Sequence, residues 1–139
     1  KIAGKMHVID TYSWLDYFSN TEANELLRNL IESPEEIYTP TLVFSELKRV
    51  LLRKILMGQE NRDGMRKKLN FVRLNSLIMD LDIDIAEKGA ELIDELSQSR
   101  KGMGLADAII LATATKLNVK LVTGDEHFRG LDNVLFIKE

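Results

Sequence analysis

Residues 105–117 read Leu-Ala-Asp-Ala-Ile-Ile-Leu-Ala-Thr-Ala-Thr-Lys-Leu, and residues 119–125 read Val-Lys-Leu-Val-Thr-Gly-Asp. The first stretch is almost continuously apolar and rich in alanine. It is too long for a strand, so it predicts a buried helix. The second stretch predicts a short strand over 119–122, followed by a turn at Gly124. A buried helix leading directly into a strand is typical of a parallel sheet covered by helices.

The same alternation extends over the rest of the chain. Short apolar runs at 6–9, 37–39, 76–80 and 134–137 predict further strands. Apolar residues at helical spacing predict two short helices after the first strand and longer helices over 41–57, 61–73 and 82–97, the last one capped by Asp82. We therefore expect an α/β fold whose parallel sheet is covered on both faces, with ligands at the carboxyl ends of its strands.

Length and composition limit the class of protein. A chain of 139 residues has room for one domain, 1–139, in which we give residues 1–5 no weight. The contents of hydrophobic residues, 45%, and charged residues, 29%, are those of a soluble globular protein. The lack of cysteine excludes disulfides, thiolate zinc sites and cysteine nucleophiles. Together with the absence of a signal peptide pattern or a long apolar run, this composition indicates a cytoplasmic protein.

The charge is unevenly distributed along the chain. The net charge is −3, yet residues 48–73 hold nine basic and two acidic residues, a local charge of +7 that leaves −10 elsewhere. A basic surface of this kind can bind the phosphates of a nucleic acid, although most charge runs are simply solvated helix faces. The candidates for RNA binding within this run are Arg53, Arg62, Arg66 and Lys67.

Four acidic residues occupy informative positions: Asp10, Glu46, Asp107 and Asp125. Two follow strands and two lie on apolar faces of helices, so we expect all four at the same edge of the sheet. Clustered carboxylates repel one another, and a bound divalent cation would offset that repulsion. Oxygen ligands without histidine or cysteine favour Mg²⁺ or Mn²⁺, and such sites hydrolyse phosphodiesters with one metal ion or two.

Each of these acids also has a purely structural alternative. Asp10 fits a helix cap, and Asp107 lies in a first helical turn, where the helix dipole favours an anion. Asp125 fits a turn after Gly124. A buried Glu46 needs a partner, and a salt bridge to Arg49 or Arg53 would also supply one.

Four segments together resemble the PIN-domain family, and in particular the VapC toxins of bacterial and archaeal toxin–antitoxin pairs. They are Val-Ile-Asp-Thr at 8–11, Ser-Glu at 45–46, Gly-Leu-Ala-Asp-Ala-Ile-Ile-Leu-Ala-Thr-Ala at 104–114 and Leu-Val-Thr-Gly-Asp-Glu-His-Phe at 121–128. The last two are the most specific. The resemblance covers nearly the whole chain, and it departs from the family at Tyr12, where many members have a small polar residue.

The resemblance implies a three-layer α/β/α fold with a parallel sheet of about five strands. It implies a Mg²⁺- or Mn²⁺-dependent endoribonuclease whose four acids bind the metal and catalyse RNA cleavage, with Thr11 and Thr123 as hydroxyl neighbours that orient them. It also implies a homodimer and an antitoxin protein that fills the RNA-binding groove.

Other residues have simpler interpretations. Asp80, Asp82 and Asp84 fit a strand end and a helix cap, while His7 and His127 fit a strand and a loop. The aromatic side chains of Trp14, Phe18, Phe44 and Phe71 fit core or dimer contacts. Apolar positions on the 41–57 helix, together with those of the next helix, predict a self-association surface; on the first helix they are Leu47, Leu51, Leu52 and Ile55.

Two other functions remain open. A phosphotransfer or phosphatase domain would use Asp10 as its nucleophile, but such enzymes need a second acid two residues further on, where this chain has Tyr12. A catalytically silent PIN-like module for RNA binding or scaffolding would keep the fold alone, but it would be expected to have lost one or more of the four acids.

Overall fold

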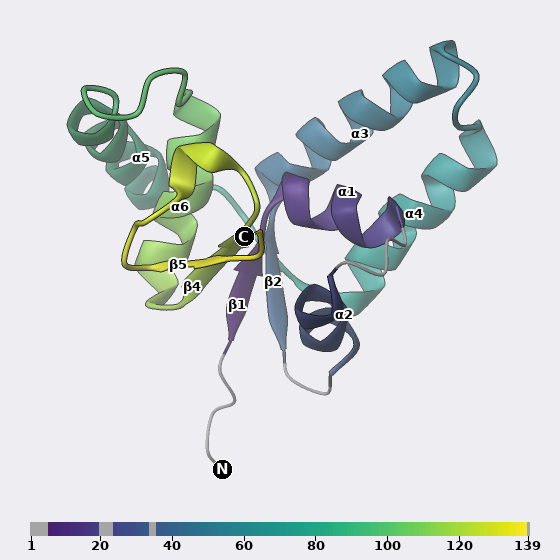
Figure 1. Ribbon diagram of the computed structural model, residues 1–139, viewed down its shortest axis with the longest axis horizontal. Helices are drawn as coiled ribbons and strands as arrows, with labels where there is room; N and C mark the ends of the chain where they lie inside the picture. Colours follow the sequence, from purple (N-terminus) through teal and green to yellow (C-terminus); the bar gives the residue numbers. More distant parts are fainter. Residues whose placement is uncertain (1–5, 20–23, 34–35, 139) are drawn as a thin grey trace.

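A parallel five-stranded sheet forms the centre of the fold (Figure 1). The computed structural model describes residues 6–19, 24–33 and 36–138, so residues 1–5 lie outside the described part. The strand order is β3-β2-β1-β4-β5, and all neighbouring pairs are parallel. The strands are β1 His7–Ile9, β2 Ile37–Pro40, β3 Leu77–Met79, β4 Lys120–Thr123 and β5 Val134–Phe136. The predicted α/β class and strand number are confirmed.

Helices cover both faces of this sheet, as predicted. Figure 1 shows α1 to α4 on one side of the strands and α5 with α6 on the other. Their bounds are α1 Thr11–Ser19, α2 Glu25–Glu32, α3 Thr41–Leu56, α4 Arg62–Asn75, α5 Ile83–Leu96 and α6 Leu105–Leu117, and a short 3₁₀ helix, η1, covers Glu126–Phe128. None of the helices in the described ranges is long and apolar enough to cross a membrane.

The strand order creates a switch point between β1 and β4. The chain first adds β2 and β3 on one side of β1, then crosses back and adds β4 and β5 on its other side. Since such crossovers are right-handed, reversing the direction moves the connecting helices to the opposite face. The register pairs Ile9 with Val122, so the residues that follow β1 and β4 leave the sheet side by side. Ligands of open α/β sheets bind at this position.

Capping side chains, proline and glycine in the sequence account for where several of the helices begin and end. The side chain of Asp82 caps α5 by accepting a hydrogen bond from Ile85 N–H at 2.8 Å, as predicted. α3 begins immediately after Pro40, and Gly58 follows its end with φ +74°, a conformation that costs glycine little. The fourth strand begins one residue later than the predicted Val119.

An aromatic cluster joins α1 to α4 within the core. Trp14 is fully buried, stacks on Phe18 and meets the edge of Phe71. Its indole Nε1–H donates to Thr39 Oγ1 at 3.1 Å, which satisfies the one polar atom of the ring. Phe44 is partly buried against the same core. The interpretation of these four rings as core contacts is confirmed.

The predicted self-association surface on α3 is wrong for two of its four residues. Leu47 and Leu51 are fully buried in the core, and Leu52 and Ile55 are partly buried against it. Leu47 and Leu51 therefore belong to the core and not to an outer surface. The periodicity of an isolated helix shows that one face is apolar, but it does not show whether the same chain covers that face.

The packing of α5 on α6 depends on Gly89. A Cβ at this position would lie 2.6 Å from Ile109 Cγ1 and 3.1 Å from Ile109 Cα, too close for either atom. Gly89→Ala should therefore force the helices apart and lower the free energy of unfolding by about 1–3 kcal/mol, measured by urea denaturation. Gly64→Ala in α4 is the control, because the nearest atoms there belong to the flexible Glu60 and Asn61 side chains. Equal losses in the two variants would contradict a close contact between α5 and α6.

Candidate active site

A pocket of about 300 Å³ opens at the switch point of the sheet. All four acids selected from the sequence line it, although they come from four separate parts of the chain: the ends of β1 and β4, and helices α3 and α6. The residues around the pocket are Asp10, Thr11, Tyr12, Glu46, Arg49, Val50, Asp107, Ile110, Asp125 and Phe128. The fold therefore brings the four carboxylates to one place.

Asp10 is the most buried of the four acids. Its Oδ1 accepts a hydrogen bond from Ser13 N–H at 2.8 Å, so it caps α1 while it faces the pocket. Burial raises the pKa of this carboxyl to about 7, because the charged form loses its hydration. Hydrogen bonds from Thr123 and Ser13 lower this pKa, and the nearby charge of Asp125 raises it further. The carboxyl of Asp10 thus both caps α1 and lines the pocket.

Glu46 is held by a hydroxyl and not by a cation. Thr11 Oγ1 donates to Glu46 Oε1 at 2.6 Å, and no ion pair of Glu46 with Arg49 or Arg53 occurs among the described residues. On the opposite side of the pocket, Thr123 Oγ1 accepts a hydrogen bond from Asp125 N–H at 3.0 Å. Thr11 thus contacts the carboxylate of Glu46, and Thr123 contacts the backbone of Asp125.

Asp107 and Asp125 of this pocket form a close group with His127, which lies beside it. One ligand atom from each lies within 4.8 Å of the others. Asp107 stands in the first turn of α6 and accepts a hydrogen bond from Gly104 N–H at 3.2 Å. Burial raises the pKa of Asp107, the Gly104 hydrogen bond lowers it, the charge of Asp125 raises it and His127 lowers it. Asp10 and Glu46 line the same pocket outside this group.

His127 is a site residue that the sequence analysis interpreted as a loop position. It lies in η1, where its backbone N–H and its Nδ1 both contact Asp125 Oδ1, at 3.0 and 2.8 Å. An ionised carboxylate only accepts hydrogen bonds, so Nδ1 carries the proton of this contact. The signal in the sequence was the spacing of two residues between an aspartate and a histidine, which an Asx turn brings together.

Two more residues at the site were not selected from the sequence. The N–H of Ser13 donates to Asp10 Oδ1, and its hydroxyl donates to Val122 O at 2.8 Å, which ties α1 to β4. Arg49 lies one helical turn after Glu46 and lines the same pocket. The spacing of three residues places both next to an acid, but such spacing is too common to identify them without the fold.

The departure at Tyr12 has a structural explanation. A Cβ at Gly124 would collide with the Tyr12 ring, so the absence of a side chain at 124 makes room for this tyrosine. The ammonium of Lys138 lies 5.6 Å from the centre of the same ring. Position 12 thus supplies a wall of the pocket and not a second acid, and the phosphotransferase alternative lacks the residue that it needs.

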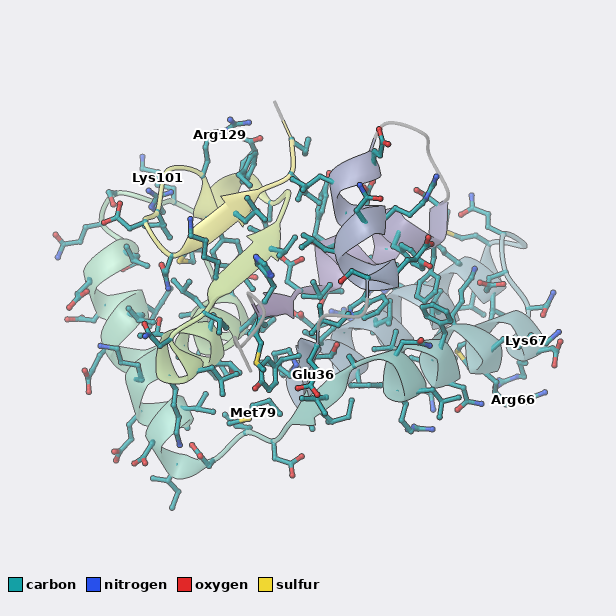
Figure 2. The ribbon with its side chains drawn as sticks, turned by 90° about the horizontal axis from the view of Figure 1, so that it is seen from below. Glu36, Arg66, Lys67, Met79, Lys101 and Arg129 are labelled. Carbon is teal, nitrogen blue, oxygen red and sulfur yellow. The ribbon has the colours of Figure 1, made fainter. Side chains whose placement is uncertain are left out.

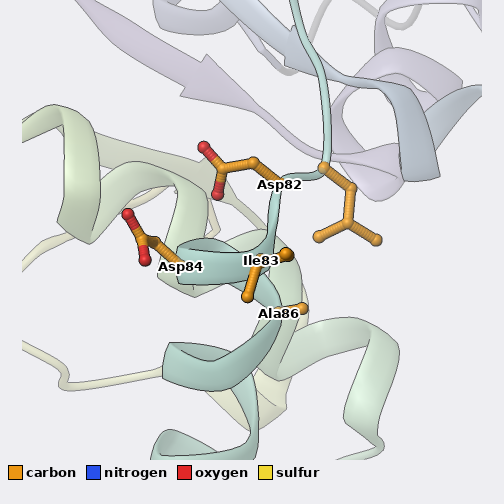
Figure 3. Close-up of a pocket in the computed structure, with 5 residues that line it drawn as sticks. Asp82, Ile83, Asp84 and Ala86 are labelled. Atoms are coloured by element: carbon orange, nitrogen blue, oxygen red, sulfur yellow. The ribbon is translucent and has the colours of Figure 1, made fainter.

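A larger hollow, about 580 Å³, lies at the start of α5 (Figure 3). Its acids, Asp82 and Asp84, both form ion pairs with Lys116, and Asp82 also caps the helix. Asp80 follows the end of β3. The interpretation of this acidic run as a strand end and a helix cap is confirmed.

Comparison with known proteins agrees with this fold. The family model described as "PIN domain" matches residues 7–134. The chain belongs to the PIN-domain family. Comparison with curated proteins gives no match.

Several solved structures share the fold of this PIN domain. A toxin–antitoxin complex from Klebsiella pneumoniae is 27% identical with a TM-score of 0.69, over 96% of this chain and 98% of that one. VapBC2 from Rickettsia felis, bound to a DNA fragment from its promoter, is 19% identical with a TM-score of 0.73, over 94% and 96%. VapC20 from Mycobacterium tuberculosis, described as a toxin that cleaves the sarcin–ricin loop, is 17% identical with a TM-score of 0.64, over 88% and 92%.

The residues of this PIN domain fit a divalent cation. The donor set is carboxylate oxygens with one imidazole, and the pKa values of Asp10 and Asp107 are raised by burial and by the neighbouring charge of Asp125. A cation among these groups would offset the repulsion between the carboxylates.

The raised pKa of Asp10 predicts a pH-dependent stability. A carboxyl whose pKa is higher in the folded state binds its proton more tightly there, so its stabilising contribution is complete at low pH. The free energy of unfolding should fall by up to about 1.4 kcal/mol per pH unit as the pH rises from the unfolded value of 3.8 to about 7. Urea denaturation in EDTA, compared between the wild type and Asp10→Asn, measures this contribution. The variant should lack it, and parallel pH curves would show that Asp10 titrates normally.

Proposed function

We propose that this PIN domain is a Mg²⁺- or Mn²⁺-dependent endoribonuclease that hydrolyses RNA phosphodiester bonds, and that it is the toxin of a VapBC-type toxin–antitoxin pair. The observation that carries the proposal is the pocket at the switch point, where four acids from distant parts of the chain converge. The similarity to toxin–antitoxin structures, including one described as RNA-cleaving, supports the choice of RNA.

In this proposal Asp10, Glu46, Asp107 and Asp125 are the catalytic and metal-binding residues. A bound divalent cation would lower the pKa of an attacking water and stabilise the charge on the phosphate oxygens. Thr11 orients Glu46, while Thr123 and Ser13 hold the carboxyl of Asp10. Arg49 places a fixed positive charge at the pocket, suited to a phosphate of the substrate.

The alternative is a PIN module that binds RNA or serves as a scaffold without cleaving it. The hydrogen bond from Thr11 to Glu46 argues against it, because it holds a carboxylate in the pocket that a silent module would not need. Activity of the purified chain decides between the two functions.

Asp107→Asn should separate catalysis from structure. The amide oxygen can still accept the Gly104 hydrogen bond, while one of the repelling charges is removed. We expect a higher melting temperature without metal, a smaller stabilisation by Mn²⁺ and no cleavage of RNA. For the wild type, Mn²⁺ at a hundred times its Kd should add about 2.7 kcal/mol of stability.

The control for this experiment is Asp94→Asn, which removes an exposed charge of α5 outside the pocket. It should retain wild-type cleavage and the full stabilisation by Mn²⁺. Loss of stability in metal-free Asp107→Asn, together with an unchanged Mn²⁺ effect, would instead make Asp107 a structural residue of the helix start.

Some basic residues of the run 48–73 lie near the carboxylate pocket, and others lie far from it. Arg53 follows the pocket residue Arg49 by one turn of α3. Figure 2 places Arg66 and Lys67 at the outer end of the α3–α4 arm, where both form ion pairs with Asp63, at 3.8 and 3.1 Å. We keep Arg53, Arg62, Arg66 and Lys67 as the proposed RNA-binding set.

Changing these four residues to glutamate should weaken RNA binding and flatten its dependence on salt. The slope of the logarithm of the binding constant against the logarithm of the salt concentration should fall by about 0.9 for each lost contact with a duplex phosphate, or by about 0.7 for each lost contact with a single strand. Fluorescence anisotropy with labelled RNA at several salt concentrations measures both quantities. Stabilisation by Mn²⁺ should stay unchanged as an internal control. An unaltered salt slope would assign the arm to protein contacts.

The remaining expected partners are also proposals. We propose a cytoplasmic homodimer and an antitoxin protein that covers the RNA groove. Exposed apolar side chains at the β3 edge and the start of α5 offer a surface for the second copy, namely Leu77, Ile78, Leu81 and Ile83. We propose these four side chains as the dimer surface in place of Leu47 and Leu51 of α3, which are buried.

A further inference from the structure

A second pocket, of about 450 Å³, adjoins the carboxylate site. It lies between the α5–α6 connection and η1, and we call it the Lys101 pocket. Its walls are Ser99, Arg100, Lys101, Glu126 and His127. His127 of this pocket contacts Asp125 of the carboxylate pocket, with its Nδ1 2.8 Å from Asp125 Oδ1. A ligand in the Lys101 pocket would therefore lie beside the candidate metal ligands.

The charges around the Lys101 pocket favour an anion. Arg100 and Lys101 are both cationic, and Lys101 forms no ion pair among the described residues. The single acid, Glu126, is neutralised by a two-pronged contact in which Arg129 Nε and Nη2 donate to its two oxygens, at 2.8 and 2.9 Å. Two cations beside a neutralised acid leave the pocket with a positive balance.

The walls of this pocket are held in place without any ligand. Arg100 Nη1 donates to the carbonyl oxygens of His127, at 3.0 Å, and Arg129, at 2.6 Å, which fastens the α5–α6 connection to η1. Gly102 permits the close approach, since its φ is +87° and a Cβ there would lie 2.9 Å from His127 Nε2. Because little rearrangement is needed, a ligand loses less free energy in ordering the site.

We propose that the Lys101 pocket binds a phosphate of the RNA backbone next to the scissile bond. This inference rests on the proposed ribonuclease function and specifies how the strand crosses the site. The carboxylates would then lie between two sources of positive charge: Arg49 on the α3 side, and Arg100 with Lys101 on the η1 side. Figure 2 shows Lys101 and Arg129 on the same side of the molecule, far from Arg66 and Lys67. Contacts of this kind fix the position of the strand without reading its bases.

The test asks whether the charge of Lys101 and the charge of one RNA phosphate act together in binding. The RNA is a short strand whose cleavage site by the wild type has been mapped, prepared with a single uncharged methylphosphonate at each linkage in turn. Binding is measured with Mn²⁺ in the cleavage-deficient Asp107→Asn protein, with and without Lys101→Ala. Lys120→Ala is the control, since this exposed lysine begins β4 and so lies at the amino-terminal ends of the strands, opposite the carboxyl ends where the pocket opens.

We expect Lys101→Ala to weaken binding by up to about fivefold and to lower the salt slope by about 0.7. At one linkage next to the scissile bond, the combined loss from the uncharged phosphate and Lys101→Ala should be smaller than the product of the two separate losses. Lys120→Ala should show no such coupling, and Lys101→Ala in the otherwise wild-type protein should leave the Mn²⁺-induced rise in melting temperature unchanged.

Independent losses at every linkage, or a loss no larger than that of Lys120→Ala, would overturn the phosphate assignment while leaving the nuclease proposal intact. A reduced Mn²⁺ effect in Lys101→Ala would also overturn it, because the lysine would then act through the metal site. Failure of the wild type to bind and cleave RNA would overturn both proposals.

Discussion

The parallel pairing of β1 with β4 is the constraint on which the rest of the structure depends. It places Ile9 opposite Val122, so that Asp10 and Asp125 follow neighbouring strand ends. The backbone N–H of Asp10 and the hydroxyl of Ser13 both donate to Val122 O, at 3.4 and 2.8 Å, and these bonds fix the start of α1 against β4. Because the crossovers reverse direction at this pair, α3 approaches the same edge from one face of the sheet and α6 from the other, and each brings a further acid.

This convergence has an electrostatic cost that the protein only partly offsets. Hydrogen bonds from Thr11, Ser13 and Gly104 stabilise the carboxylates, yet burial and the neighbouring charge of Asp125 still raise the pKa values of Asp10 and Asp107. A site that holds its acids rigidly while leaving them short of positive charge favours uptake of a cation or a proton. Close packing of α5 on α6 at Gly89 supports the helix that carries Asp107.

The positive charges complement this arrangement. The net charge of −3 argues against a general nucleic-acid binder, but cations stand on two sides of the acids, with Arg49 on α3 and Arg100 with Lys101 before α6. A strand that crosses the pocket would thus have its phosphates held on either side of the candidate metal ligands. The densest basic cluster in the sequence, by contrast, lies largely on the α3–α4 arm, where Asp63 already binds Arg66 and Lys67.

The sequence by itself determined the alternation of strands and helices, the buried character of α6 and the acids that follow strands. Hydrophobic periodicity and the position of an acid directly after an apolar run are local properties of the chain. The family resemblance then added Thr11 and Thr123 as hydroxyl neighbours of those acids. Only the tertiary structure decided that β4 lies beside β1, that Thr11 binds Glu46 across 35 positions of sequence and that Leu47 and Leu51 are buried. It also brought Arg49 into the pocket and His127 against Asp125. Contacts between residues far apart in the chain depend on strand order and helix packing, and a periodic pattern shows that a face is buried without showing which partner covers it.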